Sequence, residues 1–168
     1  DDTGRRITDP DAGPLFGNTQ DDQDTESGTI YVLRSLSQHP AIAPHREVIH
    51  KIGVTGGEVD IRVSNAENDP TYLFAGVEVV ATYKLFNINR SKLENLLHRF
   101  FAAARLDVEI PDRFGRPVKP REWFLVPLDV IDQAVERLRD KTITQFAYDP
   151  NRAKLVTAAS HGSGRATK

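Results

Sequence analysis

Two short segments with alternating apolar and polar residues constrain the fold of this chain more than any other feature. They are 29–36 (Thr-Ile-Tyr-Val-Leu-Arg-Ser-Leu) and 48–55 (Val-Ile-His-Lys-Ile-Gly-Val-Thr), and Gly56-Gly57 ends the second. The alternation predicts two β-strands, each with one apolar face. If the strands pair as a long hairpin, one face packs a core and the other presents Tyr31 beside Lys51.

The remaining predicted elements combine helices and strands. A helix should begin at about residue 58 and end before Asp69-Pro70, because the residue before proline avoids helical backbone angles. A second helix at about 90–105 has an apolar stripe with α-helical spacing. The other predicted elements are a strand at about 76–85, a loop at 111–121, a short strand at 123–126 and a helix at about 128–140.

The length of 168 residues allows one domain with tails. We expect an acidic leader or linker at 1–27, a folded domain at 28–145 and a flexible C-terminal tail at 146–168. The leader carries eight acidic residues against two arginines, a net charge of −6, and the remainder has a net charge of +4. A basic body fits a nucleic-acid-binding protein, although two ordinary solvated surfaces explain the same pattern.

Cysteine and methionine are both absent from the chain. The lack of cysteine excludes disulfides and thiolate metal sites and is compatible with a reducing compartment, so we expect a cytoplasmic protein. Because position 1 is not methionine, we expect a processed product or a piece of a larger parent protein with further domains. No apolar run approaches the roughly 20 residues of a membrane-spanning helix.

The helix at 90–105 carries two side chains suited to chemistry. Glu94 lies at the border of the apolar stripe, and His98 lies one turn further on the same side. Such a carboxylate can face a cleft, but Ser91-Lys92-Leu93-Glu94 also matches a capping box, in which Glu94 only caps the helix. One Glu with one His is too few ligands for zinc, whereas one carboxylate with substrate phosphates suits Mg²⁺.

Several basic residues are candidates for contacts with phosphate. Arg62 follows the second strand by one short helix, although a solvated surface arginine is the ordinary alternative. The loop at 111–121 combines three prolines and a glycine with four basic residues: Arg113, Arg116, Lys119 and Arg121. Taken singly, Tyr31 is an ordinary strand tyrosine and His98 an ordinary half-buried helical histidine.

Six motifs occur in an order that is more specific than any one of them. They are Thr29-Ile30-Tyr31, Lys51-Ile52-Gly53-Val54-Thr55, Arg62, Asp69-Pro70-Thr71, Glu94 with Leu97-His98 and Phe100, and Arg121-Glu122-Trp123-Phe124. In this set the chain resembles the GIY-YIG nuclease superfamily, and most closely its phage T5 DNA-binding-domain branch (T5orf172-like). The resemblance covers about 28–131. Thr29 and Lys51 stand where the superfamily usually has glycine and tyrosine, and its late asparagine has no counterpart that we can place.

The resemblance implies an α+β fold, with a small mixed or antiparallel three-stranded sheet flanked by helices. It also implies an endonuclease that hydrolyses DNA phosphodiester bonds with one divalent metal, Mg²⁺ or Mn²⁺. Glu94 would be the metal ligand, Arg62 would stabilise the phosphate, and Tyr31 would take a proton with Lys51 as the nearby cation or a base itself. His98 would orient a water or a phosphate.

Two other functions remain open at this stage. A DNA-binding module of the same fold without turnover would use Arg62 and the basic loop to hold phosphates, and Glu94 would revert to a helix cap. A protein-interaction domain would show no salt-dependent DNA binding.

Overall fold

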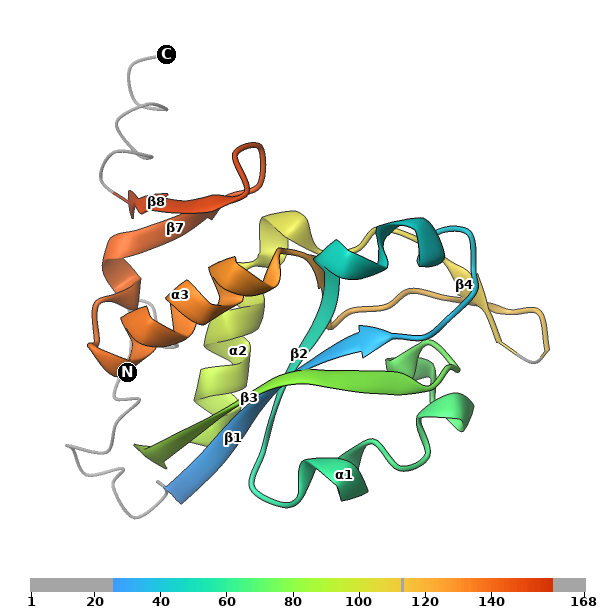
Figure 1. Cartoon of the computed structure of the whole chain (residues 1–168), viewed down its shortest axis with the longest axis horizontal. Helices are drawn as coiled ribbons and strands as arrows, with labels where there is room; N and C mark the ends of the chain where they lie inside the picture. The colour runs from blue at the N-terminus through green and yellow to red at the C-terminus, as the bar shows by residue number, and fades with distance from the viewer. Residues whose placement is uncertain (1–25, 113, 159–168) are drawn as a thin grey trace, which may run out of the picture.

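In the computed structural model, which describes residues 26–112 and 114–158, the central sheet has four antiparallel strands in the order β3-β1-β2-β6 (Figure 1). The strands are β1 (Glu26–Ser35), β2 (Ile49–Thr55), β3 (Val77–Ile88) and β6 (Trp123–Leu125). The predicted α+β class is therefore confirmed, and β6, which lies within the short strand predicted at 123–126, joins the predicted three-stranded sheet as a fourth strand. The predicted hairpin is also confirmed, because β1 pairs with β2 and places Tyr31 opposite Gly53.

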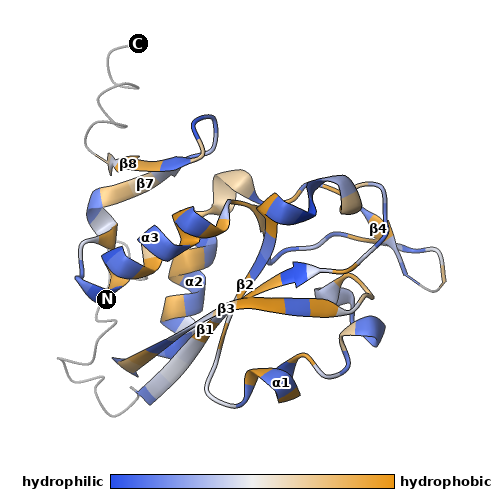
Figure 2. Cartoon of the chain, in the orientation of Figure 1, coloured by the Kyte–Doolittle hydropathy of each residue, from blue (hydrophilic) through white to orange (hydrophobic). Residues whose placement is uncertain are grey.

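Two longer helices, α2 and α3, cover one face of this sheet. Their apolar residues pack on the inward side chains of β1 and β2, and Figure 2 shows hydrophilic and hydrophobic residues alternating along both helices. The helices in the described part of the chain are α1 (Val59–Arg62), α2 (Arg90–Phe100) and α3 (Leu128–Arg139). The 3₁₀ turns of the same part lie at Ala43–Val48, Ala66–Asn68, Pro70–Tyr72, Ala102–Ala104 and Ile143–Gln145. Within the described residues, each of these helices is too short or too polar to span a membrane.

The predicted helix, which was to begin at about residue 58 and end before Asp69, is wrong in extent. Only Val59–Arg62 forms an α-helix, and two 3₁₀ turns follow it. Alternate β-branched residues and the Ser64-Asn65 pair that follows disfavour helix propagation, since these residue types lose side-chain freedom or compete for backbone hydrogen bonds. The short α1 nevertheless covers the second face of the sheet, where Val59 and Val63 pack against Tyr31 and its neighbours.

The second face of the hairpin is buried rather than open. Tyr31 and Leu33 form a small core with Ala66 and Tyr72, and Lys51 on the same face is only 1% exposed. The sequence led us to expect one core face and one face that presents polar groups. Instead, both faces are covered, so the polar groups of Tyr31 and Lys51 need partners from the protein itself.

Two small hairpins lie outside the central sheet. The first pairs β4 (Ile110–Pro111) with β5 (Pro117–Val118), within the predicted loop. The second pairs β7 (Phe146–Asp149) with β8 (Lys154–Thr157) and adds Tyr148 and Leu155 to the main core. The expectation of a flexible tail from 146 is therefore wrong for 146–157, because strands of four residues give too short an alternation to stand out in a sequence.

The predicted leader and the end of the predicted tail lie outside the described residues. The structure describes only the last two positions of the predicted leader, Glu26 and Ser27, and both belong to β1. Glu26 pairs with Arg90 at the start of α2, with 2.7 Å between the carboxylate and the guanidinium. Two residues that were predicted to belong to the leader are thus part of the central sheet.

Candidate functional site

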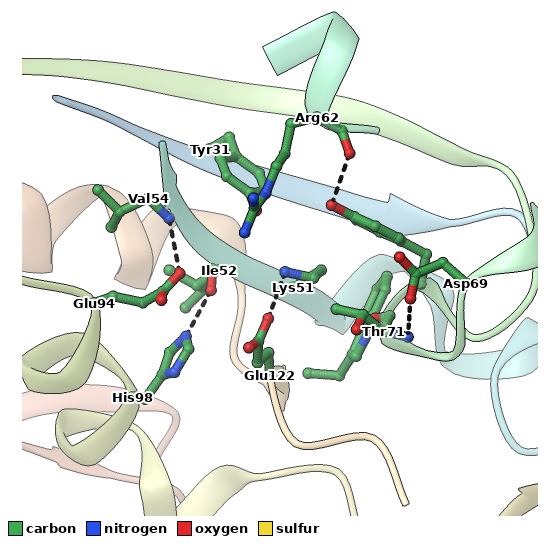
Figure 3. A network of polar contacts seen from close by, with 12 residues as sticks. Tyr31, Lys51, Ile52, Val54, Arg62, Asp69, Thr71, Glu94, His98 and Glu122 are labelled. Carbon is green, nitrogen blue, oxygen red and sulfur yellow. Dashed lines mark hydrogen bonds and ion pairs between the residues drawn. The ribbon is translucent and has the colours of Figure 1, made fainter. Parts of the chain in front are cut away.

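Four predicted site residues gather at β2 (Figure 3). Lys51 belongs to β2 itself, and the others come from neighbouring elements: Tyr31 from β1, Arg62 from the end of α1 and Glu94 from α2. Tyr31 and Glu94 both act electrostatically on Arg62. The tertiary structure therefore brings together groups that are up to 63 positions apart in the sequence.

Tyr31 reaches this site because the residue opposite it is glycine. A Cβ atom at Gly53 would lie 2.4 Å from both Cζ and Oη of Tyr31, closer than any real contact. The tyrosine ring therefore crosses β2 over Gly53, and its hydroxyl emerges where Arg62 Nε donates to it at 3.4 Å. The path of the Tyr31 side chain thus explains why the motif Lys51-Ile52-Gly53-Val54-Thr55 has a glycine at position 53.

Arg62 is an exposed side chain with its polar head directed at Tyr31 (Figure 3). The hydrogen bond and the charge of Tyr31 raise the pKa of the Arg62 guanidinium above its already high ordinary value, and Tyr72 and Glu94 act in the same direction. Its backbone carbonyl accepts a hydrogen bond from the Tyr72 hydroxyl at 3.1 Å. The short helix α1 is therefore held at its C-terminal end, the end that carries the Arg62 side chain.

Tyr72 is a site residue that the sequence analysis missed. Burial, followed by the charge of Tyr31 and a hydrogen bond with it, raises the pKa of Tyr72. Tyr72 thus stays protonated across the physiological range. Asp69 places it, because the Asp69 carboxylate accepts from the Thr71 backbone N–H at 2.8 Å and starts the turn that carries Tyr72. The motif Asp69-Pro70-Thr71 could have directed attention to the residue that follows it.

Lys51 lies at the centre of this face, and its partner is Glu122. Its Nζ lies 2.7 Å from the Glu122 carboxylate and 5.2 Å from the ring centroids of both Tyr31 and Tyr72. The predicted proximity of Tyr31 and Lys51 is confirmed. However, the ammonium is over the aromatic face and already paired with a carboxylate, and the cation at the Tyr31 hydroxyl is Arg62. Glu122 was missed as a site residue, although it belongs to a quoted motif.

Glu94 does not cap α2. The N-cap is Asn89, whose side chain accepts from the Lys92 backbone N–H at 3.0 Å. The capping-box alternative is therefore wrong, because the N-cap of α2 is Asn89, two residues before Ser91, and the helix itself begins at Arg90. Glu94 instead faces β2, where its Oε2 accepts from the Val54 backbone N–H at 3.1 Å.

His98 lies one turn beyond Glu94 and also contacts β2. Its Nε2 donates to the Ile52 carbonyl at 2.7 Å, so the proton of the neutral ring is on Nε2. The ring packs at a tilt against Phe124, with 5.5 Å between ring centroids. Together with Glu94, this contact fixes α2 to the backbone of β2, and we assign His98 this anchoring role in the structure.

Of the predicted DNA-binding residues, Arg116, Lys119 and Arg121 are exposed, and Arg113 lies outside the described residues. Lys119 and Arg121 line a shallow groove that also contains Glu122, so the basic segment adjoins the Lys51–Glu122 pair. The other lining residues are Pro70, Thr71, Val118 and Pro120.

Similarity to known proteins shows the family of the chain. The model of the T5orf172 domain family matches residues 28–139. The chain belongs to the T5orf172 domain family. It is also 43% identical over 135 residues to the uncharacterized protein YeeC of Bacillus subtilis (strain 168), a match that covers 80% of this chain and 35% of that protein. The chain thus spans about a third of the length of this relative. No solved structure matches the present chain.

The donor groups of this T5orf172 domain fit one type of metal better than others. Among residues 26–112 and 114–158, no three His, Asp or Glu side chains come together as a metal site. Glu94 is a half-buried carboxylate with one oxygen fixed by the Val54 N–H, which leaves the other oxygen as a donor. A single carboxylate suits Mg²⁺, which retains several waters and takes further oxygens from substrate phosphates.

Proposed function

We propose that this T5orf172 domain is a metal-dependent endonuclease of the GIY-YIG type, which hydrolyses DNA phosphodiester bonds. The observation that carries the proposal is the convergence on β2 of a tyrosine hydroxyl, an exposed arginine and a fixed carboxylate. These are a proton acceptor, a donor for a phosphate oxygen and a ligand for a hard cation. Together they can supply the proton transfer and the charge stabilisation that phosphodiester hydrolysis uses.

Glu94 holds the metal in this proposal. The Val54 N–H orients its carboxylate, and the helix that carries it is anchored by Asn89 at its start and by His98 one turn after Glu94. Held there, Mg²⁺ or Mn²⁺ would supply a Lewis acid for a phosphate oxygen and positive charge near the leaving 3′ oxygen. A residue held on a helix and by a backbone hydrogen bond meets the need for a pre-organised ligand.

Tyr31 takes the proton of the attacking water. Its hydroxyl accepts from the Arg62 guanidinium, with 3.4 Å between Oη and Nε, so it lies beside the donor that would hold the phosphate. Tyr72 is the neighbouring phenol, but burial raises its pKa, so it acts as a neutral donor that holds α1. Arg62 binds the phosphate as a charged donor, which is most effective when other contacts hold it in place.

Lys51 supports this arrangement rather than acting as a base. It is 1% exposed and bonded to Glu122, which neutralises its charge within the protein. Its position over both aromatic rings fixes Tyr31 and Tyr72 relative to each other. The Lys51–Glu122 pair thereby links the ring of Tyr31 to the basic segment that leads into β6.

A DNA-binding module without turnover is the second candidate. It is favoured by the exposed cations Arg116, Lys119 and Arg121, because phosphate binding by these residues does not require Glu94 or a metal.

Incubation of the protein with supercoiled plasmid, with Mg²⁺ or Mn²⁺ and with or without excess EDTA, tests the proposal. We expect nicked or linear DNA only when the metal is free. Salt-dependent binding without cleavage in either metal would favour the binding module. Cleavage in EDTA would reject the metal, and the absence of salt-dependent binding would reject both candidates.

A further inference from the structure

The tip of the β4–β5 hairpin displays an aromatic side chain to solvent. Phe114 is 73% exposed, the highest value among the large hydrophobic residues that the structure describes. The turn beneath it is tightly bonded, because the Asp112 carboxylate accepts from the backbone N–H groups of Phe114 at 2.8 Å and of Arg116 at 2.9 Å. Gly115 supplies the positive φ of 80° that this turn needs. The exposed ring therefore sits on a well-formed turn.

The surroundings of Phe114 are cationic. The Arg116 guanidinium lies 5.6 Å from the centroid of the ring. Lys119 and Arg121 follow on the same segment, and the ion pair of Lys119 with Asp107 is long, at 3.8 Å, between highly exposed side chains. Within residues 26–112 and 114–158, neither Arg116 nor Arg121 has an acidic partner in an ion pair. An aromatic ring interleaved with cations is the pattern by which proteins hold single-stranded or unstacked nucleic acid.

The hairpin is fixed relative to the candidate site. At its base, Ile110 is buried in a core cluster with Trp123 of β6. From Phe114 the chain runs directly to Glu122, the partner of Lys51. Eight extended residues span at most about 29 Å, which corresponds to fewer than about nine base pairs of duplex DNA. A single stretch of bound DNA can thus reach both the site and the tip.

We propose that Phe114 stacks on an unstacked base, so that this chain acts on DNA with an unpaired or distorted step near the scissile phosphate. This inference rests on the proposed function. Phenylalanine has no hydrogen-bonding group, so its contact recognises the face of any base and reports stacking rather than sequence. In a duplex, the same side chain acts as an apolar wedge at a flexible step. Arg116 and its neighbours supply the phosphate contacts.

The test measures DNA binding in EDTA, which separates binding from cleavage. Three DNAs of equal length are compared: a duplex, a duplex with a one-nucleotide gap and a single strand, each with 2-aminopurine at successive positions. Phe114→Ser is the test variant, and Phe114→Trp retains a stacking ring. Phe86→Ser is the matched control, because Phe86 is 68% exposed, has Lys84 near its ring and lies near the C-terminal end of β3, across the molecule from β4 (Figure 1).

We expect the wild-type chain to bind gapped DNA more tightly than intact duplex, and to change the fluorescence at one or two 2-aminopurine positions. Phe114→Ser should lose this signal and bind the gapped DNA about 5- to 150-fold more weakly, with an unchanged dependence on salt. Phe114→Trp and Phe86→Ser should behave as wild type. Arg116→Gln should instead lower the salt slope by about one.

Equal binding and fluorescence for wild type and Phe114→Ser would overturn the inference and leave the proposed nuclease untouched. Preference for intact duplex with no 2-aminopurine response would also overturn it. If the wild-type chain binds none of the three DNAs in a salt-dependent way, the proposed function and the inference both fail.

Discussion

Replacement of Glu94 by glutamine separates the catalytic role of this residue from its structural one. The Glu94 carboxylate accepts from the Val54 backbone N–H at 3.1 Å, and Val54 is 8% exposed. A glutamine carbonyl can accept the same hydrogen bond, so the cost in free energy of unfolding should stay within about 0.5–1.5 kcal/mol. Glu94→Ala leaves a buried N–H without a partner and should cost about 1–3 kcal/mol.

The effect on cleavage should be much larger than the effect on stability. A metal ligand supports charge stabilisation worth several kcal/mol, which corresponds to a loss of at least about 100-fold in rate. Asn89→Ala provides the opposite case, because it removes the true N-cap of α2 and should cost about 0.5–2 kcal/mol of stability without touching the site. We therefore expect Glu94→Gln to be folded and inactive, and Asn89→Ala to be less stable and active.

Two measurements on each variant decide the matter. Trp123 is the one tryptophan of the chain and is buried, so its fluorescence follows unfolding in urea. Plasmid nicking with Mg²⁺, at a temperature where each variant is folded, gives the rate. If stably folded Glu94→Gln cleaves at the wild-type rate, Glu94 is not the ligand, and its role is limited to holding α2 on β2.

Four further predictions follow from the packing around β2. Tyr31→Phe keeps the buried ring and should fold normally, yet lose cleavage by roughly 10²–10⁴-fold; a wild-type nicking rate would make the tyrosine structural. Gly53→Ala places a Cβ 2.4 Å from the Tyr31 hydroxyl. It should lower the free energy of unfolding in urea by about 1–3 kcal/mol and also lower the rate of cleavage. An unchanged cleavage rate would contradict the assigned path of the Tyr31 ring over Gly53. Glu122→Leu should destabilise the protein more than Lys51→Met, because the lysine it leaves unpaired is 1% exposed and the glutamate 35%; the reverse order of urea midpoints would reject the pair. Burial lowers the pKa of His50 below its ordinary value. As the pH falls, the histidine of the unfolded chain therefore becomes protonated before that of the native state. The stability from neutral His50 is complete above about pH 6.5 and falls as the pH decreases, by up to about 1.4 kcal/mol per pH unit. His50→Gln should remove that part of the pH dependence between pH 7.5 and 5.5, and equal slopes in both proteins would contradict the shift.

The sequence by itself determined the parts of this protein that depend on local periodicity. The alternation in 29–36 and 48–55 predicts the hairpin, and a strict period of two then requires Tyr31 and Lys51 to share a face. The apolar stripe of α2 likewise follows from helical spacing and predicts Glu94 at the edge of the stripe. The ordered motifs indicated the family for the same reason, since they are patterns along the chain.

Other features were decided only by segments that meet in three dimensions. The partner of Lys51 is Glu122, 71 positions away, and it is fixed because β6 pairs with β2. The choice between a cap and a site residue for Glu94 depended on where the helix begins and on whether a backbone N–H of β2 lies within reach. A sequence shows which groups can form hydrogen bonds and carry charge. The packing of distant elements determines which of these groups lose contact with water and must therefore find a partner inside the protein.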